Sequence, residues 1–124
     1  VEEGLRHLCS GNYSLAIATG KARIGLDRVL QHTKLRELFV ASRCADEAAS
    51  KPHPRMVLDL LTATGVPADK AIVVGDTSYD IKMAHRANAD ALAVCYGVHH
   101  RDDLQAEQPL DCVDNFAAVL DWFL

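Results

Sequence analysis

The stretch "VVGDTSYD", residues 73–80, places two aspartates four residues apart, directly after a run of small and β-branched apolar residues. The apolar run predicts the end of a buried strand, and the polar residues after it predict the start of a helix. Asp76 then leaves the strand end, and Asp80 enters the first helical turn. We therefore expect the two carboxylates to approach each other closely.

Apolar and amphipathic segments alternate along the rest of the chain. Continuously apolar strands separated by helices predict a parallel sheet with both faces covered, which is a doubly wound, Rossmann-like α/β fold. We expect residues 1–124 to form one domain, without internal repeats or linkers. The predicted strands are 15–19, 38–42, 71–75 and 91–97, and the predicted helices are 2–8, 25–39, 52–65, 78–88 and 115–124.

Composition limits the classes of partner. The net charge of -4 argues against nucleic acid or an anionic membrane as the main partner, because nothing would offset the repulsion. No apolar run approaches the roughly 20 residues that a membrane span needs, and no export signal is visible. The four cysteines contain no C-x-x-C pair, so we interpret them as reduced thiols and expect a cytoplasmic protein.

Polar residues follow three of the predicted strands, at the edge of the sheet where ligands of such folds bind. Thr19 and Gly20 end the first strand, Lys51 lies in a later loop, and Asp76 and Asp80 flank the end of the third. Taken singly, Thr19 is an ordinary strand end or helix cap, Lys51 a solvated lysine, and the aspartates favourable first-turn charges. Together they suggest that Thr19 and Gly20 donate to a phosphate and that Lys51 balances its charge.

The two aspartates are the strongest single signal. Like charges at short range need a proton or a cation between them. Mg²⁺ fits best, since it commonly takes one or two carboxylates together with water and phosphate oxygens. We therefore assign Asp76 and Asp80 as metal ligands.

The segments "LAIATGK", "SKPHP" and "VVGDTSYDIKMA" resemble, in this order, motifs two, three and four of the haloacid dehalogenase-like (HAD) hydrolases, in the phosphoglycolate-phosphatase-like branch. The resemblance covers nearly the whole chain. It implies that Thr19 bonds the transferring phosphoryl group and that Lys51 neutralises charge around it. It also implies that Asp76 and Asp80 hold Mg²⁺, one directly and the other directly or through water.

The chain departs from the family pattern at its start. The family's first motif, D-x-D-x-[T/S], supplies the attacking aspartate, but no D-x-D occurs here and no aspartate precedes Asp27. The helical cap that selects the substrate is missing as well. The chain therefore resembles the C-terminal part of a phosphatase, and we expect it to be inactive alone.

The missing first motif also has a structural consequence. In the family its strand is central, so its loss should separate the strand pair that begins at residue 15 from the pair that begins at residue 71. The unpaired edges lead us to expect self-association, direct closure of the gap, or poor stability.

We expect the complete protein to be a Mg²⁺-dependent phosphatase of a small phosphorylated metabolite such as phosphoglycolate, acting through an aspartyl-phosphate. The alternatives are a catalytically dead phosphate-binding or interaction module and a phosphomutase relative. The substrate is left open, because the segment that would select it is absent. The roles of Lys21, His53 and the pair His99 and His100 are also left open, although a surface pair and a loop histidine are the ordinary interpretations.

Overall fold

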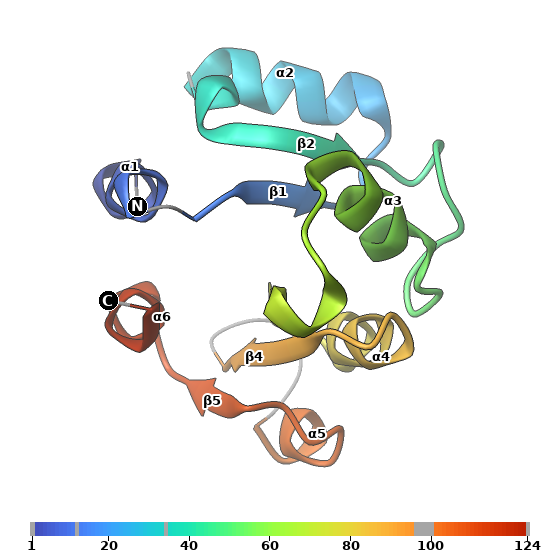
Figure 1. Cartoon of the computed structure of the whole chain (residues 1–124), viewed down its shortest axis with the longest axis vertical. Helices are drawn as coiled ribbons and strands as arrows, with labels where there is room; N and C mark the ends of the chain where they lie inside the picture. Colours follow the sequence, from blue (N-terminus) through green and yellow to red (C-terminus); the bar gives the residue numbers. More distant parts are fainter. Residues whose placement is uncertain (1, 12, 34, 96–100, 124) are drawn as a thin grey trace.

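The computed structural model describes residues 2–11, 13–33, 35–95 and 101–123. The described chain alternates between strands and helices, as the apolar pattern predicts (Figure 1). The strands are β1 (Leu15–Ala18), β2 (Phe39–Arg43), β3 (Ile72–Gly75), β4 (Asp90–Val94) and β5 (Asp111–Val113). The helices are α1 (Glu2–Ser10), α2 (Arg23–Thr33), α3 (Arg55–Thr64), α4 (Ser78–Arg86), α5 (Arg101–Gln105) and α6 (Phe116–Phe123), with 3-10 turns η1 (Arg36–Leu38) and η2 (Ala68–Lys70).

The strands form two separate parallel sheets. One sheet has the order β1-β2 and the other the order β3-β4-β5. The Rossmann-like parallel α/β architecture is thereby confirmed, and so is the separation of the first two strands from the later ones. Among the described residues β1 does not pair with β3, so of the three expected outcomes direct closure of the gap is wrong, and self-association and poor stability stay predictions.

Two details of the predicted elements are also wrong. A fifth strand, β5, and the helix before it were not predicted, because three residues are too few to show a strand pattern. The predicted helix 25–39 is broken instead of continuous. Helix α2 ends at Thr33, and the next turn is a tight 3-10 turn in which the backbone N–H of Leu38 donates to Leu35 O at 3.0 Å. This turn buries Leu38 and redirects the chain into β2.

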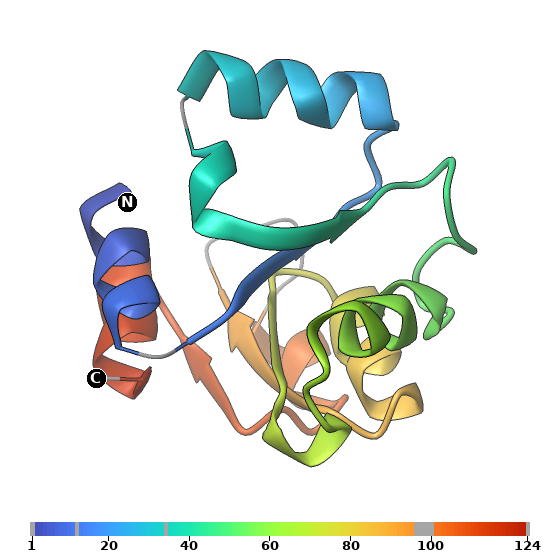
Figure 2. The same ribbon diagram turned by 45° about the horizontal axis from the view of Figure 1, so that its top comes forward.

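The main core lies between β4 and the helices α3 and α4, which Figure 2 shows side by side. Helix α3 supplies Val57 and Leu61, four residues apart, and α4 supplies Ile81 and Ala84, three residues apart, which are spacings that bring side chains to one helix face. Ala18, at the end of β1, packs against the same cluster. The end of β1 therefore reaches the core of the second sheet, although no backbone hydrogen bond joins the two sheets within the part of the chain that the structure describes.

Helices α1 and α6 pack together on the side of the molecule away from α3 (Figures 1 and 2). A Cβ at Gly4 would lie 2.6 Å from Leu120 Cδ1, so a larger residue there would force the Leu120 side chain to move. The Tyr13 hydroxyl donates to Phe123 O at 2.9 Å, and the two rings meet edge to face. The N-terminal region is thereby fastened to the last helix.

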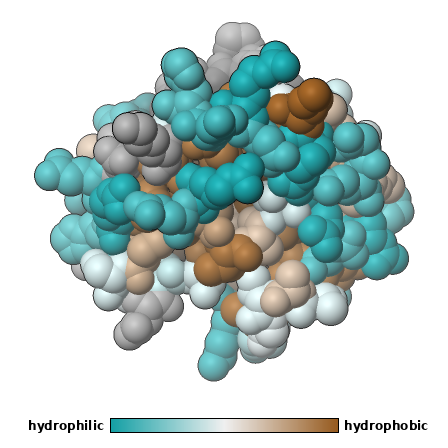
Figure 3. Space-filling model, turned by 90° about the horizontal axis from the view of Figure 1, so that it is seen from above, coloured by the Kyte–Doolittle hydropathy of each residue, from teal (hydrophilic) through white to brown (hydrophobic). Residues whose placement is uncertain are grey.

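The face seen from above is mainly hydrophilic, with apolar side chains in separate patches (Figure 3). Within the described ranges, every helix is too short or too polar to cross a membrane.

Candidate active site

The turn from β3 into α4 is built around Asp80. Thr77 is the N-cap of α4, and Asp80 is its third residue. The Thr77 hydroxyl accepts from the Asp80 backbone N–H at 3.3 Å, and Asp80 Oδ2 accepts from the Thr77 backbone N–H at 3.2 Å. This reciprocal capping box satisfies two N–H groups that the start of a helix would leave unpaired. It also fixes the direction of the Asp80 side chain.

Gly75 is the last residue of β3, and its lack of a side chain makes the turn possible. A Cβ at this position would lie 2.6 Å from Asp80 Oδ2 and closer still to Asp80 Cβ. Contacts this short are forbidden, so any other residue would displace the Asp80 carboxylate. Gly75 therefore decides how closely the first helical turn approaches the strand end.

Lys51 reaches this carboxylate from the loop that precedes α3. Its Nζ lies 2.6 Å from Asp80 Oδ1, and the Asp80 side chain is only 8% exposed. A charge-assisted contact in such a shielded place is stronger than a surface ion pair. The Arg86 guanidinium adds a second link from α4 to this loop by donating to Pro52 O at 3.4 Å. Lys51 and Asp80, 29 positions apart in the sequence, are thus brought together.

Asp76 lies between the strand end and the capping box and is half-buried. Within the described ranges it takes part in no ion pair with a lysine or arginine. The two aspartates therefore differ, because both oxygens of Asp80 are already engaged by Lys51 and Thr77.

Thr19 and Gly20 follow β1 on the other sheet. The Thr19 backbone N–H donates to Arg43 O at 3.1 Å and so extends the pairing of β1 with β2. Thr19 Oγ1 accepts from the Lys21 backbone N–H at 3.1 Å, which orients the hydroxyl and leaves its proton to be donated. Gly20 is exposed, with open space where a Cβ would lie.

The remaining candidate residues have simpler positions. Lys21 is exposed beside Thr19. His53 Nδ1 accepts from the backbone N–H of Arg55, the first residue of α3, at 3.1 Å, so its described role is at the start of that helix. His99 and His100 lie outside the described residues.

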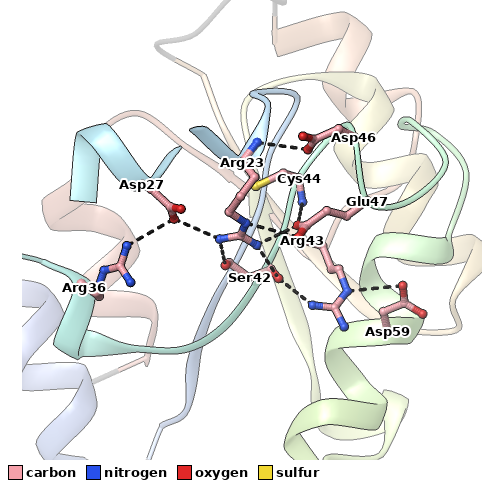
Figure 4. Close-up of polar contacts among 9 residues, drawn as sticks. All are labelled: Arg23, Asp27, Arg36, Ser42, Arg43, Cys44, Asp46, Glu47 and Asp59. Carbon is pink, nitrogen blue, oxygen red and sulfur yellow. Dashed lines mark hydrogen bonds and ion pairs between the residues drawn. The ribbon is translucent and has the colours of Figure 1, made fainter. Parts of the chain in front are cut away.

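A polar network that the sequence did not reveal lies beside the Thr19 loop (Figure 4). Arg23 Nη2 lies 2.7 Å from Glu47 Oε1, and Arg23 Nε lies 3.3 Å from Glu47 Oε2. This two-point contact lowers the pKa of the Glu47 carboxyl and raises that of the Arg23 guanidinium. Arg23 and Glu47 are 24 positions apart, so no local spacing marks the pair.

Cys44, Asp46 and Glu47 offer three ligand atoms within 4.8 Å of one another. The Glu47 carboxylate is already held by Arg23, and Asp46 Oδ1 accepts from the Arg23 backbone N–H at 3.0 Å. Burial raises the pKa of the Cys44 thiol, which opposes formation of a thiolate. These groups therefore serve the protein's own network, and the metal candidates remain the aspartates at the end of β3.

The comparisons with known proteins identify the family of the chain. The model of the family described as "Haloacid dehalogenase-like hydrolase" matches residues 1–94. The chain is 37% identical over 121 residues to "Probable phosphatase IndB" of Dickeya dadantii, covering 97% of this chain and 53% of that protein. It is 31% identical to a phosphoglycolate phosphatase of Colwellia psychrerythraea, covering 97% of this chain and 54% of that protein.

The crystal structure titled as a predicted phosphoglycolate phosphatase from Haemophilus somnus superposes with a TM-score of 0.91 at 26% identity, covering 100% of this chain and 56% of that one. The chain belongs to the haloacid dehalogenase-like hydrolase family. It spans about half the length of the curated relatives it matches.

Proposed function

We propose that the protein to which this chain belongs is a Mg²⁺-dependent phosphatase that hydrolyses a small phosphomonoester. The observation that carries the proposal is the shielded contact of Lys51 with Asp80 at 2.6 Å, beside Asp76 at the carboxyl end of β3. A fixed ammonium and two carboxylates at one strand end suit a doubly charged phosphate, which needs both cationic groups and a metal around it. Phosphoglycolate is the proposed example of the substrate, since relatives of this chain carry the name phosphoglycolate phosphatase.

Thr19, Gly20 and Lys51 are the proposed phosphate-binding groups. The oriented Thr19 hydroxyl and the Gly20 backbone N–H would donate to phosphate oxygens. Lys51 would supply positive charge, and Asp80 would hold the ammonium in place instead of leaving it to move in solvent. Thr19 and Lys51 are therefore the proposed catalytic residues of this chain.

The carboxylates at the end of β3 fit Mg²⁺ because they offer hard oxygen donors at a half-buried position. Asp76 is the proposed direct ligand. Asp80 is the proposed ligand through water, since Lys51 and Thr77 already contact both of its oxygens. When bound, Mg²⁺ supplies charge that stabilises the transferring phosphoryl group.

The attacking group is proposed to lie in a segment that precedes this chain in the complete protein. A carboxylate there would attack phosphorus and form an aspartyl-phosphate, which water then hydrolyses. The residues of this chain position the phosphate and balance its charge, but none of the proposed groups is the nucleophile. Residues 1–124 alone are therefore expected to release no phosphate.

The experiment is a phosphatase assay of the complete protein on phosphoglycolate and p-nitrophenyl phosphate, with Mg²⁺ titrated. Asp76→Asn should weaken Mg²⁺ binding and slow phosphate release together. Asp90→Asn is the matched control, because Asp90 is exposed at the amino end of β4, whereas the candidate site lies at the carboxyl ends of the strands. Unchanged metal dependence in Asp76→Asn would remove Asp76 from the site, and a wild type without phosphatase activity would contradict the function.

Two further properties belong to the same proposal. Cytoplasmic placement rests on the four cysteines, all of them free. Self-association of residues 1–124 rests on the edges of β1 and β3, each of which lacks a strand partner on one side among the described residues. Sedimentation of this fragment over a range of concentrations tests the association, and a monomer throughout would contradict it.

A further inference from the structure

Arg23, the first residue of α2, holds the segment after β2 with its whole guanidinium (Figure 4). Besides its two-point contact with Glu47, Arg23 Nη1 donates to Ser42 Oγ at 2.8 Å and Nη2 donates to Ser42 O at 3.2 Å. A planar guanidinium fits such a set of acceptors in one orientation only. Arg23 is thereby fixed relative to the end of β2 as well as to Glu47.

Backbone contacts join the same two segments. The Ala45 backbone N–H donates to Lys21 O at 2.9 Å, and the Arg23 backbone N–H donates to Asp46 Oδ1 at 3.0 Å. Glu47 Oε1 also accepts from the Cys44 backbone N–H at 2.9 Å, so the carboxylate that binds Arg23 also closes its own turn. The loop that begins at Thr19 and the turn at residues 44–47 therefore form one hydrogen-bonded unit.

The position of this unit in the chain gives it a further consequence. Thr19 lies four residues before Arg23, and Lys51 lies four residues after Glu47. The Arg23–Glu47 contact therefore lies, in the sequence, four residues from each of the proposed phosphate-binding residues Thr19 and Lys51.

Neighbouring charged residues also contact the Arg23–Glu47 pair and the end of β2. Asp27 Oδ1 lies 3.4 Å from Arg23 Nη1 and 3.3 Å from Arg36 Nη2, so a second carboxylate and a second guanidinium limit the motion of the Arg23 side chain. On the other side, Arg43 Nη1 donates to Ser42 O at 2.9 Å and Arg43 Nε lies 3.5 Å from Asp59 Oδ2 on α3. The network thus runs from α2 across the end of β2 to α3.

We propose that Arg23 and Glu47 are positioning residues, which hold the Thr19 loop and the Lys51 loop in the relative arrangement that phosphate transfer requires. The proposal rests on the proposed function. Neither residue needs to touch the substrate, because their effect passes through Thr19 and Lys51. Misplacement of a binding group by about 1 Å can slow an enzyme by about 100-fold, so a modest loosening would be measurable.

The test measures kcat and KM of the complete protein on p-nitrophenyl phosphate with saturating Mg²⁺. Arg23→Gln and Glu47→Gln should each lower kcat by about 10- to 100-fold. In a Thr19→Ala background, Arg23→Gln should lower kcat by a clearly smaller factor than in the wild type, because one of the two groups that it positions is already gone. A merely structural role would lower stability equally in both backgrounds without this loss of effect on kcat.

Glu47→Gln covers the case in which Arg23→Gln does not fold, since a glutamine oxygen can still accept from the Cys44 N–H. The matched control is Glu107→Gln, which removes a pair of Glu107 with Lys82 at 3.4 Å from a side chain of similar exposure, 27% against 34% for Glu47. The control should keep the wild-type kcat.

Two outcomes overturn the positioning role. One is a wild-type kcat in both Arg23→Gln and Glu47→Gln, and the other is an equal loss with and without Thr19. If the wild type is active and Thr19→Ala is impaired, either outcome contradicts the positioning role alone. A wild type that releases no phosphate contradicts both the positioning role and the proposed function.

Discussion

Strand β4 and its neighbour β3 show what a missing partner does to a strand. Four of the five residues of β4, which lies between β3 and β5, are buried. No residue of β3 or β1 is buried, and each of them has a described strand partner on one side only. All three segments are similarly apolar, so the difference comes from their neighbours. A strand with partners at both edges and helices on both faces is thus more completely buried here than β3 or β1, although the edge strand β5 also buries Cys112 and Val113.

The two sheets are nevertheless held together by contacts at the amino ends and at the carboxyl ends of β1 and β3. At the amino ends, α1 packs on α6. At the carboxyl ends, Lys51 crosses from the loop after β2 to Asp80 on α4. The first half of the chain is therefore joined to the second by side chains and helices, whereas within each half the strands are joined by backbone hydrogen bonds.

Two matched valine substitutions test the difference between β4 and β3 directly. Val94→Ala in β4 removes methyl groups that are 4% exposed and should lower the free energy of unfolding by about 2–3 kcal/mol. Val74→Ala in β3, at 44% exposed, should lower it by about 0.5 kcal/mol. Urea unfolding measures both values.

The same pair of variants in the complete protein sharpens the comparison. If a further strand lies between β1 and β3 there, the cost of Val74→Ala should rise toward that of Val94→Ala. Equal costs already in residues 1–124 would show that β3 is as well covered as β4, and the comparison would fail.

The Lys51–Asp80 ion pair, which joins the first half of the chain to the second, should make the next largest contribution to the free energy of unfolding. Lys51→Met leaves the shielded Asp80 carboxylate without its cation and should cost about 2 kcal/mol in urea unfolding. Adding Asp80→Asn should recover part of this loss, since the unpaired charge is then removed. Lys70→Met, at an exposed lysine, is the control and should stay within about 0.5 kcal/mol of the wild type. A Lys51 variant as stable as this control would show that the pair does not hold the halves together.

The capping box of Thr77 and Asp80 stabilises the start of α4 and joins residues of the second half of the chain only. Thr77→Ala removes the N-cap of α4 and should lower the free energy of unfolding by about 1 kcal/mol. Thr77→Ser, which keeps the hydroxyl, should restore most of the loss. If serine and alanine are equally destabilising, the methyl group and not the cap explains the effect.

The Arg23–Glu47 pair contributes within the first half, and its effect on stability should be the smallest and depend on pH. The pKa of Glu47 is lowered in the folded protein from its usual 4.5, chiefly by Arg23. Its contribution is therefore present above pH 4.5 and is lost as the pH falls below that value. The difference in Tm between wild type and Glu47→Gln should shrink over this range. A constant difference would show that the charge of Glu47 is not what stabilises the contact.

The sequence predicted the parts of the fold that local pattern determines. The apolar runs at 15–19, 38–42 and 71–75 contain or overlap β1, β2 and β3, and the absent central strand predicted two separate sheets. Strand β5 was missed because its three residues are too few to show a pattern. The break after Thr33 was missed because the apolar spacing of a helix continues through Leu35 and Leu38, and only the tertiary position of Leu38 favours the tight turn.

The candidate site was predicted as a set of residues but not as a set of contacts. The contact of Lys51 with Asp80 joins motifs whose convergence the family resemblance implied. The capping box could have been found from sequence, since threonine followed three residues later by an acidic residue marks it. Arg23 and Glu47 could not, because their contact depends on how the end of β2 turns beside α2, and no local spacing encodes that turn.

The hydrogen bond between Tyr13 and Phe123 spans 110 residues, and this has a consequence for the order in which the protein folds. A chain is synthesised from its N-terminus, and a contact between distant residues must overcome the entropy of closing the loop between them. Of the described helices, α1 is made before all the others, and α6, on which it packs, is made after them. The region around α1 can therefore complete its packing only after α6 has left the ribosome.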